Sequence, residues 1–202
     1  MKIVCIGRNF LQHINELSNK VPSEPVIFMK PKSAIAFLNK HIKYPRFTEE
    51  LEYEAEVVLK ISKNGSRIPE SEARNFFNEW TIGVDLTARD IQRKLKNEGL
   101  PWEKAKAFDN SAIIGDFVSV PFEELYDSYF ELYKNEEQVQ IGRTDDMIFS
   151  FEKIISYASQ FFRLQMGDLI FTGTPAGTGM ILPYDNFEGK LNGATLLQFT
   201  VI

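Results

Sequence analysis

Three acidic residues are split between two segments that otherwise have a buried character. Glu54 and Glu56 lie in Leu51–Ile61, and Asp85 lies in Thr81–Leu86. Alternate residues of a strand point to the same face, so Glu54 and Glu56 should project together. Two carboxylates that face an interior repel each other and lose solvation unless a cation joins them. Because an all-oxygen ligand set suits Mg²⁺ or Mn²⁺ better than zinc, the pattern predicts a metal-dependent enzyme.

The competing interpretation is a solvent-exposed edge strand, since Glu52 alternates with Glu54 and Glu56. Two features weigh against it. The segment continues into the apolar run Val57–Leu59, which favours burial on both faces of a strand. Asp85 also lies within a short apolar segment, where an unpaired carboxylate would be costly.

A histidine and a glutamate three residues apart form a second candidate. On a helix, residues at this spacing are neighbours, so His13 and Glu16 should project together. A carboxylate can orient an imidazole and stabilise its protonated form, as a general base requires. By spacing alone, a surface ion pair is the simpler explanation. The chain has only two histidines, however, and this one follows the turn at residues 7–9.

Two further segments could contact a ligand. Lys106 follows Pro101 and Trp102, which fix a segment able to present a lysine to an anionic substrate; a solvated loop lysine is the alternative. Residues 172–179 are rich in glycine and threonine, which permit close backbone approach and hydroxyl contacts to a carboxylate. They lack the Gly-Lys-Ser/Thr ending of a P-loop, so a plain tight turn is the alternative there.

Composition limits the class of protein. The chain has 202 residues, 44% hydrophobic and 25% charged, and we expect one globular domain over residues 1–202. A net charge of -5 and a pI of about 5.2 argue against a nucleic-acid binder. Cys5 is the only cysteine, which excludes an internal disulfide and favours a reducing, cytoplasmic location. No apolar stretch approaches the ~20 residues that span a bilayer, so no membrane partner is expected.

Hydrophobic periodicity predicts more strands than helices. The predicted strands are Lys2–Ile6, Val26–Met29, Leu51–Ile61, Thr81–Leu86, Tyr129–Tyr133, Gln138–Ile141, Asp168–Thr172 and Thr195–Ile202. The predicted helices are Phe10–Leu17, Glu72–Trp80, Ala88–Glu98 and a fourth capped by Ser150. Most strands lack a crossover helix between them, so we expect a strand-rich α+β fold with mixed or antiparallel sheets.

Several motifs, taken in order along the chain, resemble the fumarylacetoacetate hydrolase family, and specifically its small acylpyruvase and oxaloacetate decarboxylase-like members. The matching motifs are Ile6–Phe10 with His13 and Glu16, Phe28–Pro31, Tyr53–Glu56, Asp85–Asp90 with Gln92, Gly99–Trp102 through Lys106, and Thr172–Pro175. Each motif alone is weak, whereas the ordered set is specific and extends from residue 1 to nearly the end.

The resemblance implies a mixed β-sandwich roll with short helices, usually a homodimer. It implies that Glu54, Glu56 and Asp85 bind Mg²⁺ or Mn²⁺. It also implies a catalytic dyad of His13 and Glu16 on an N-terminal lid helix. Lys106 would contact the oxygens of a small 2-oxo acid substrate. The residues that would line the rest of the pocket are Arg8, Gln92 and Thr174.

The implied reaction is cleavage of a C–C bond beside a 2-oxo acid, by acylpyruvate hydrolysis, oxaloacetate decarboxylation or both. His13, held by Glu16, would activate water, and Lys106 with the metal would stabilise a pyruvate enolate. One alternative on the same fold is an isomerase or tautomerase of a 2-oxo or enol acid, which uses no attacking water. A second alternative is a non-catalytic relative that binds metal without turnover.

Overall fold

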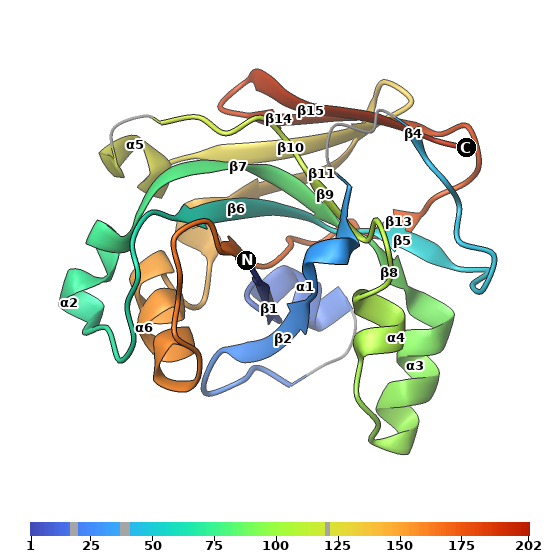
Figure 1. The fold of residues 1–202 in the computed structure, drawn as a ribbon. Coiled ribbons are helices and arrows are strands. Elements are labelled where there is room, and N and C mark those ends of the chain that lie inside the picture. Colours follow the sequence, from blue (N-terminus) through green and yellow to red (C-terminus); the bar gives the residue numbers. More distant parts are fainter. Residues whose placement is uncertain (17–19, 37–40, 120–121) are drawn as a thin grey trace.

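Two curved β-sheets packed against each other form the body of the molecule (Figure 1). This computed structural model describes residues 1–16, 20–36, 41–119 and 122–202. Within these ranges the larger sheet has the strand order β2-β1-β12-β6-β7-β9-β3. Its strands are β1 (Ile3–Gly7), β2 (Val26–Lys30), β3 (Ile35–Ala36), β6 (Ala55–Ile61), β7 (Phe77–Asp85), β9 (Ala112–Ile114) and β12 (Leu169–Phe171).

A second sheet and a small third sheet complete the strands of the described ranges. The second has the order β11-β10-β14-β15-β4, and the third has the order β13-β5-β8. The strands are β4 (His41–Ile42), β5 (Leu51–Tyr53), β8 (Thr87–Ala88), β10 (Tyr129–Lys134), β11 (Glu137–Arg143), β13 (Gly179–Met180), β14 (Asn186–Leu191) and β15 (Ala194–Val201). Parallel and antiparallel pairs both occur, which confirms the mixed, strand-rich α+β prediction.

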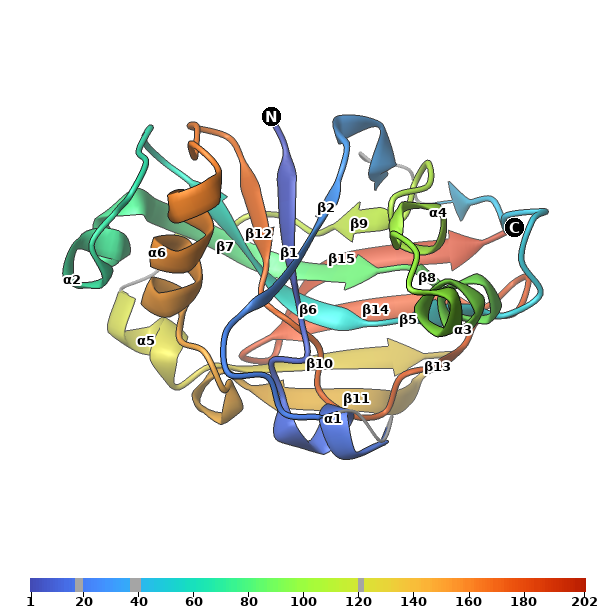
Figure 2. The same ribbon diagram turned by 90° about the horizontal axis from the view of Figure 1, so that it is seen from below.

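Short helices lie at the edges of the sheets. Helices α3 and α4 lie at one end and α2 and α6 at the other, as Figures 1 and 2 show. The α-helices are α1 (Leu11–Glu16), α2 (Glu70–Ala73), α3 (Arg89–Glu98), α4 (Glu103–Lys106), α5 (Phe122–Tyr126) and α6 (Phe151–Phe161), and the 3₁₀ turns are Lys32–Ala34, Arg74–Phe76 and Thr144–Asp146. None of the helices in the described ranges has the length and apolarity that crossing a membrane requires.

The core lies between the two large sheets. Alternate residues of β14 and β15 point inward, and the rings of Phe187 and Phe199 stack with centroids 4.7 Å apart. The run Val57–Leu59 in β6 is buried throughout, as its composition predicted. At Gly189 the sheets approach so closely that an added Cβ would lie 3.2 Å from Cδ1 and Cγ2 of Ile82, which is on β7 of the larger sheet. This glycine interrupts the hydrophobic alternation of β14, and the sequence analysis therefore missed the strand.

Two predicted elements are wrong in extent or type. The single strand over Leu51–Ile61 is broken at Glu54 into β5 and β6, which belong to different sheets. The predicted helix over Glu72–Trp80 is also wrong, because α2 ends at Ala73 and β7 begins at Phe77. Hydrogen bonding along β6 and burial of the aromatic side chains outweigh the helical spacing in this segment.

Other local predictions are confirmed. Ser150 Oγ accepts a hydrogen bond from the Lys153 N–H, 3.2 Å away, and begins α6. Gly99 ends α3 in the left-handed conformation at φ 66°. The hairpin β10–β11 turns at Asn135 and Glu136, both with positive φ. Of the helix predicted over residues 10–17, Leu17 lies outside the described residues.

Candidate active site

The three predicted metal ligands meet where β6 and β7 run side by side. Glu54 precedes β6, Glu56 is its second residue, and Asp85 ends β7. The Asp85 N–H donates to the Glu54 carbonyl at 2.8 Å, which aligns the two strands there. One carboxylate oxygen from each residue lies within 4.8 Å of the others, and all three side chains are buried. Pairing between the strands therefore gathers acidic groups that lie about thirty positions apart in the sequence.

Lys106 lies among these carboxylates. Its Nζ donates to Glu54 Oε2 at 2.7 Å, to Asp85 Oδ2 at 2.8 Å and to Thr87 Oγ1 at 2.6 Å. Burial alone would lower the pKa of Lys106, but Asp85 and Glu54 outweigh it and raise the pKa. The ammonium group is consequently held in its charged form at the centre of the site. The interpretation of Lys106 as a solvated loop lysine is wrong.

Two further buried cations, Lys30 and Arg89, lie in motifs that carry the family resemblance, but no role was predicted for them. Lys30, at the end of β2, lies with its Nζ 2.7 Å from Asp85 Oδ1. Its hydrogen bonds go instead to Ser111 Oγ at 2.9 Å and to neighbouring backbone carbonyls. Arg89 donates to Glu54 Oε1 at 2.7 Å and to Glu52 Oε2 at 2.6 Å. A lysine inside an apolar strand and an arginine directly after one were the available signals, although neither indicates its partner.

The donor set fits a hard divalent cation. Asp85 Oδ1 is buried and makes no hydrogen bond within the described residues, despite the nearby charge of Lys30. Glu56 accepts a hydrogen bond from the Gly173 N–H at 2.7 Å but forms no ion pair in the same ranges. Burial, and then the charges of Asp85 and Glu54, raise the pKa of Glu56 well above its usual range. An oxygen-only cluster in which one carboxyl group, Glu56, forms no ion pair within the described residues is the type of site that Mg²⁺ or Mn²⁺ occupies.

Glu54 has the opposite electrostatic environment. Burial would raise its pKa, but Lys106 and Arg89 outweigh burial and lower the pKa well below its usual range. Two adjacent carboxyl groups, Glu54 and Glu56, are thus shifted in opposite directions. Strongly perturbed carboxyl groups of this kind cluster at functional sites.

The predicted dyad forms on α1. His13 Nδ1 lies 3.0 Å from Glu16 Oε2, and His13 is only 6% exposed. Glu16 Oε1 accepts a second hydrogen bond from the Gly177 N–H at 3.1 Å, which joins α1 to the glycine-rich turn. With Nδ1–H donating to Glu16, His13 Nε2 is available as a base. Burial of the imidazole argues against the surface-pair interpretation.

A buried asparagine holds the turn that precedes α1. Asn9 Nδ2 donates to the Thr172 carbonyl at 2.8 Å and to the Phe149 carbonyl at 3.1 Å. Its Oδ1 accepts from the Phe149 N–H at 2.7 Å. These bonds fix the backbone on one side of Arg8, which adopts a left-handed conformation at φ 60°.

One pocket of about 40 Å³ brings most of these groups together. Seven of the nine predicted site residues line it; they are Arg8, His13, Glu54, Glu56, Gln92, Lys106 and Thr174. Glu16 and Asp85 are not among the lining residues and bond to His13 and Lys106, respectively. Gln140, which the sequence analysis missed, donates to Thr174 Oγ1 at 2.9 Å and accepts from the Ala55 N–H at 2.9 Å.

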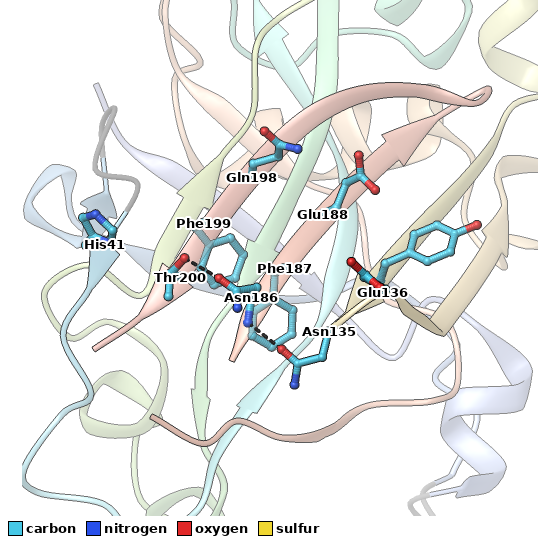
Figure 3. A pocket seen from close by; sticks show the side chains of 10 residues that line it. His41, Asn135, Glu136, Asn186, Phe187, Glu188, Gln198, Phe199 and Thr200 are labelled. Atoms are coloured by element: carbon cyan, nitrogen blue, oxygen red, sulfur yellow. Dashed lines mark hydrogen bonds between the residues drawn. The ribbon is translucent and has the colours of Figure 1, made fainter. Parts of the chain in front are cut away.

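A larger pocket of about 680 Å³ lies over β14 and β15 and contains none of the predicted residues (Figure 3). Several of its polar side chains already have hydrogen-bond partners within the protein. Thr200 Oγ1 donates to Asn186 Oδ1 at 2.7 Å, and the Asn186 N–H donates to Asn135 Oδ1 at 2.9 Å. Size alone therefore does not identify the chemical site.

Comparison with known proteins agrees with this geometry. Residues 2–201 match the family described as fumarylacetoacetate (FAA) hydrolase C-terminal. The chain is 40% identical to mitochondrial oxaloacetate tautomerase FAHD1 of Mus musculus, over 98% of this chain and 90% of that one. It is 37% identical to oxaloacetate tautomerase YcgM of Escherichia coli (strain K12), over 96% and 90%. A crystal structure of fumarylpyruvate hydrolase from Pseudomonas aeruginosa with Mn²⁺ and pyruvate matches with a TM-score of 0.93 and 34% identity, covering 100% of this chain and 89% of that one.

Proposed function

Because this chain belongs to the fumarylacetoacetate hydrolase family, we propose that it is a metal-dependent enzyme that interconverts the keto and enol forms of a small 2-oxo acid of the oxaloacetate type. The names of two relatives that match nearly its whole length support this reaction. The observation that carries the proposal is His13, oriented by Glu16, in the same pocket as two of the acidic residues and Lys106. A base, a cation and a metal-binding cluster are what enolisation requires.

Glu54, Glu56 and Asp85 would hold Mg²⁺ or Mn²⁺. When bound, such an ion supplies Lewis-acid charge that polarises the substrate's 2-oxo group and acidifies the adjacent C–H bond. The Mn²⁺ and pyruvate in the crystal structure of the fumarylpyruvate hydrolase support this assignment.

The remaining chemistry belongs to side chains of this chain. His13 Nε2 accepts the proton from the carbon next to the 2-oxo group, and Glu16 stabilises the resulting imidazolium. The Lys106 ammonium group stabilises the negative charge that develops on the 2-oxo oxygen. Returning the proton to that oxygen gives the enol. The step conserves all atoms of the substrate and consumes no water.

C–C bond cleavage of an acylpyruvate is the second candidate function. It passes through the same enolate but needs an attacking water and room for the acyl group. The observation that favours it is a neighbouring pocket of about 380 Å³, which shares Phe28, Trp102 and Lys106 with the first. The name of the fumarylpyruvate hydrolase supports this reaction as well.

One experiment separates the two functions. The purified protein with Mg²⁺ is incubated with oxaloacetate while enol absorbance is followed, and separately with fumarylpyruvate while pyruvate release is assayed. Keto–enol exchange that is faster with Mg²⁺ than with a chelator supports the tautomerase. Pyruvate release from fumarylpyruvate supports hydrolysis. If neither rate exceeds the rate with a chelator, both proposals are wrong.

The homodimer and the cytoplasmic location belong to the same proposal. The usual assembly of the family supports a dimer, and the single buried cysteine is consistent with a reducing compartment. Light scattering coupled to size-exclusion chromatography tests the assembly, since a dimer would have about twice the mass of the 23.2 kDa chain.

A further inference from the structure

We infer that Arg8 and Lys96 form a second anion site in the catalytic pocket, which takes the distal carboxylate of a dicarboxylic 2-oxo acid. This inference rests on the proposed function, because it assumes that the 2-oxo end of the substrate lies at the acidic cluster. It assigns a role to Lys96, and it predicts that the enzyme selects among 2-oxo acids by the charge of the group at the far end of the substrate. Four observations support it.

The first observation is a buried, unsatisfied donor on Arg8. Its side chain lines the pocket, yet its Nε is buried and has no hydrogen-bond partner within the described residues. An unpaired guanidinium donor in such a position is costly, and a ligand carboxylate can satisfy it. The Asn9 hydrogen bonds hold the adjacent backbone, which places Arg8 beside the pocket.

The second observation is the position of Lys96. It lies on α3, is partly buried and lines the same pocket, with its Nζ 5.4 Å from the centroid of the Trp102 ring. Within the described ranges it forms no ion pair. Neighbouring arginines on this helix do, since Arg89 pairs with Glu52 and Glu54 and Arg93 pairs with Glu50.

The third observation is electrostatic. Burial, followed by the charges of Arg89 and Arg8, lowers the pKa of Lys96 to about 8. The cations on this side of the pocket therefore repel one another. An anion bound between them would relieve this repulsion, whereas an uncharged group would not.

The fourth observation is spacing. Arg89, Gln92 and Lys96 lie on one face of α3, and Arg89 contacts Glu54 at the acidic cluster. A helix rises about 1.5 Å per residue, so Lys96 is about 10 Å farther along the axis than Arg89. A four- or five-carbon diacid spans about 4–5 Å between its carboxylate carbons. Arg8, Arg89 and Lys96 line the same pocket as Glu54 and Glu56, so the substrate has to bridge the distance between their side chains and not the longer distance along the helix axis.

The test compares two stable ligands that differ only at the far end. The Mn²⁺-loaded protein is titrated calorimetrically with 2-oxoglutarate and with 2-oxopentanoate, which has a methyl group in place of the distal carboxylate. The wild-type protein should bind the diacid more tightly. Lys96→Met should reduce this preference about 10-fold, the value of one charge-assisted hydrogen bond, and Arg8→Gln should reduce it similarly.

The matched control is Lys94→Met, which removes an exposed lysine from the same helix and should leave the preference unchanged. Lys96→Arg should retain most of the preference, which would show that the charge, not the fold of the variant, is responsible. Equal binding of both ligands to the wild-type protein, or the same preference in Lys96→Met, would overturn this inference alone. If neither ligand binds, the proposed function fails together with it.

Discussion

The ammonium group of Lys106 lies 2.8 Å from Asp85 Oδ2, so a predicted substrate-binding lysine is also an ion-pair partner of a predicted metal ligand. The same group bonds to Glu54 Oε2. Lys106 therefore compensates buried acids and, in the proposed function, would also stabilise an enolate. The two roles lead to different measurements.

Replacing Lys106 with methionine should destabilise the fold in a metal-dependent way. Breaking a buried ion pair leaves uncompensated carboxylates, which typically costs about 3–5 kcal/mol. Urea unfolding of Lys106→Met should show a loss of this size in a chelator and a smaller loss in Mn²⁺, because the bound cation compensates the same acids. Lys104→Met removes an exposed lysine from α4 and serves as the control. Equal losses with and without Mn²⁺ would contradict a shared site.

Asp85→Asn should abolish detectable Mn²⁺ binding. The substitution removes one of three buried negative charges and replaces a carboxylate oxygen by an amide group. Isothermal titration calorimetry with MnCl₂ measures the effect directly and does not depend on the identity of the substrate. Asp116→Asn changes an exposed aspartate and should bind Mn²⁺ with the affinity of the wild-type protein. Unaltered affinity of Asp85→Asn would remove Asp85 from the ligand set.

His13→Ala should slow keto–enol exchange by about 10²-fold, the usual contribution of a general base. The affinity for Mn²⁺ should be unchanged, because His13 contacts Glu16 and is not part of the acidic cluster. The second histidine provides a matched control, since His41 is exposed and lines the distant pocket in Figure 3. Equal rates for the His13 and His41 variants would assign the proton transfer to another residue.

Asn9→Ala should destabilise the protein by about 3 kcal/mol, because it leaves the Phe149 N–H and two backbone carbonyls without their buried partner. The Michaelis constant should also rise, since the backbone beside Arg8 is no longer held. Urea unfolding and steady-state kinetics measure the two effects. Asn97→Ala, at an exposed position of α3, is the comparison. A stability change below ~0.5 kcal/mol would show that water replaces the lost bonds.

The preference for a diacid should fall as pH rises through about 8, because Lys96 loses its proton there. The charged groups that shift its pKa are Arg89 on the same helix, Arg8 from the N-terminal turn, Glu54 beside β6 and Lys106 on α4. Below this pH the ammonium group is present, and above it only Arg8 remains to bind the distal carboxylate. Calorimetry at pH 7 and pH 9 with the two 2-oxo acids measures the change. In Lys96→Arg, which stays protonated, the preference should be the same at both values.

The acidic cluster was predictable because its signal is local. Carboxylates at Glu54 and Glu56 interrupt an apolar segment, and the cost of burying them indicates a cation whatever the fold. Strand Phe77–Asp85 was harder to predict from the sequence, because its first half has helical spacing. Pairing with β6 makes this half a strand. The strand containing Gly189 was not predicted for a related reason, since the glycine interrupts its alternation at a close contact with Ile82 of the other large sheet.

Residue types and order alone indicated the class of metal, a candidate base and the family resemblance, because these depend on which chemical groups are present and in what sequence. Only the tertiary structure decided which cations neutralise which acids. Lys30 and Arg89 join the cluster from segments far apart in the chain, while Arg8 and Lys96 face the same pocket without an acidic partner in the described ranges. Charge pairing depends on distances of a few ångströms between side chains, and strand pairing and helix placement alone set those distances.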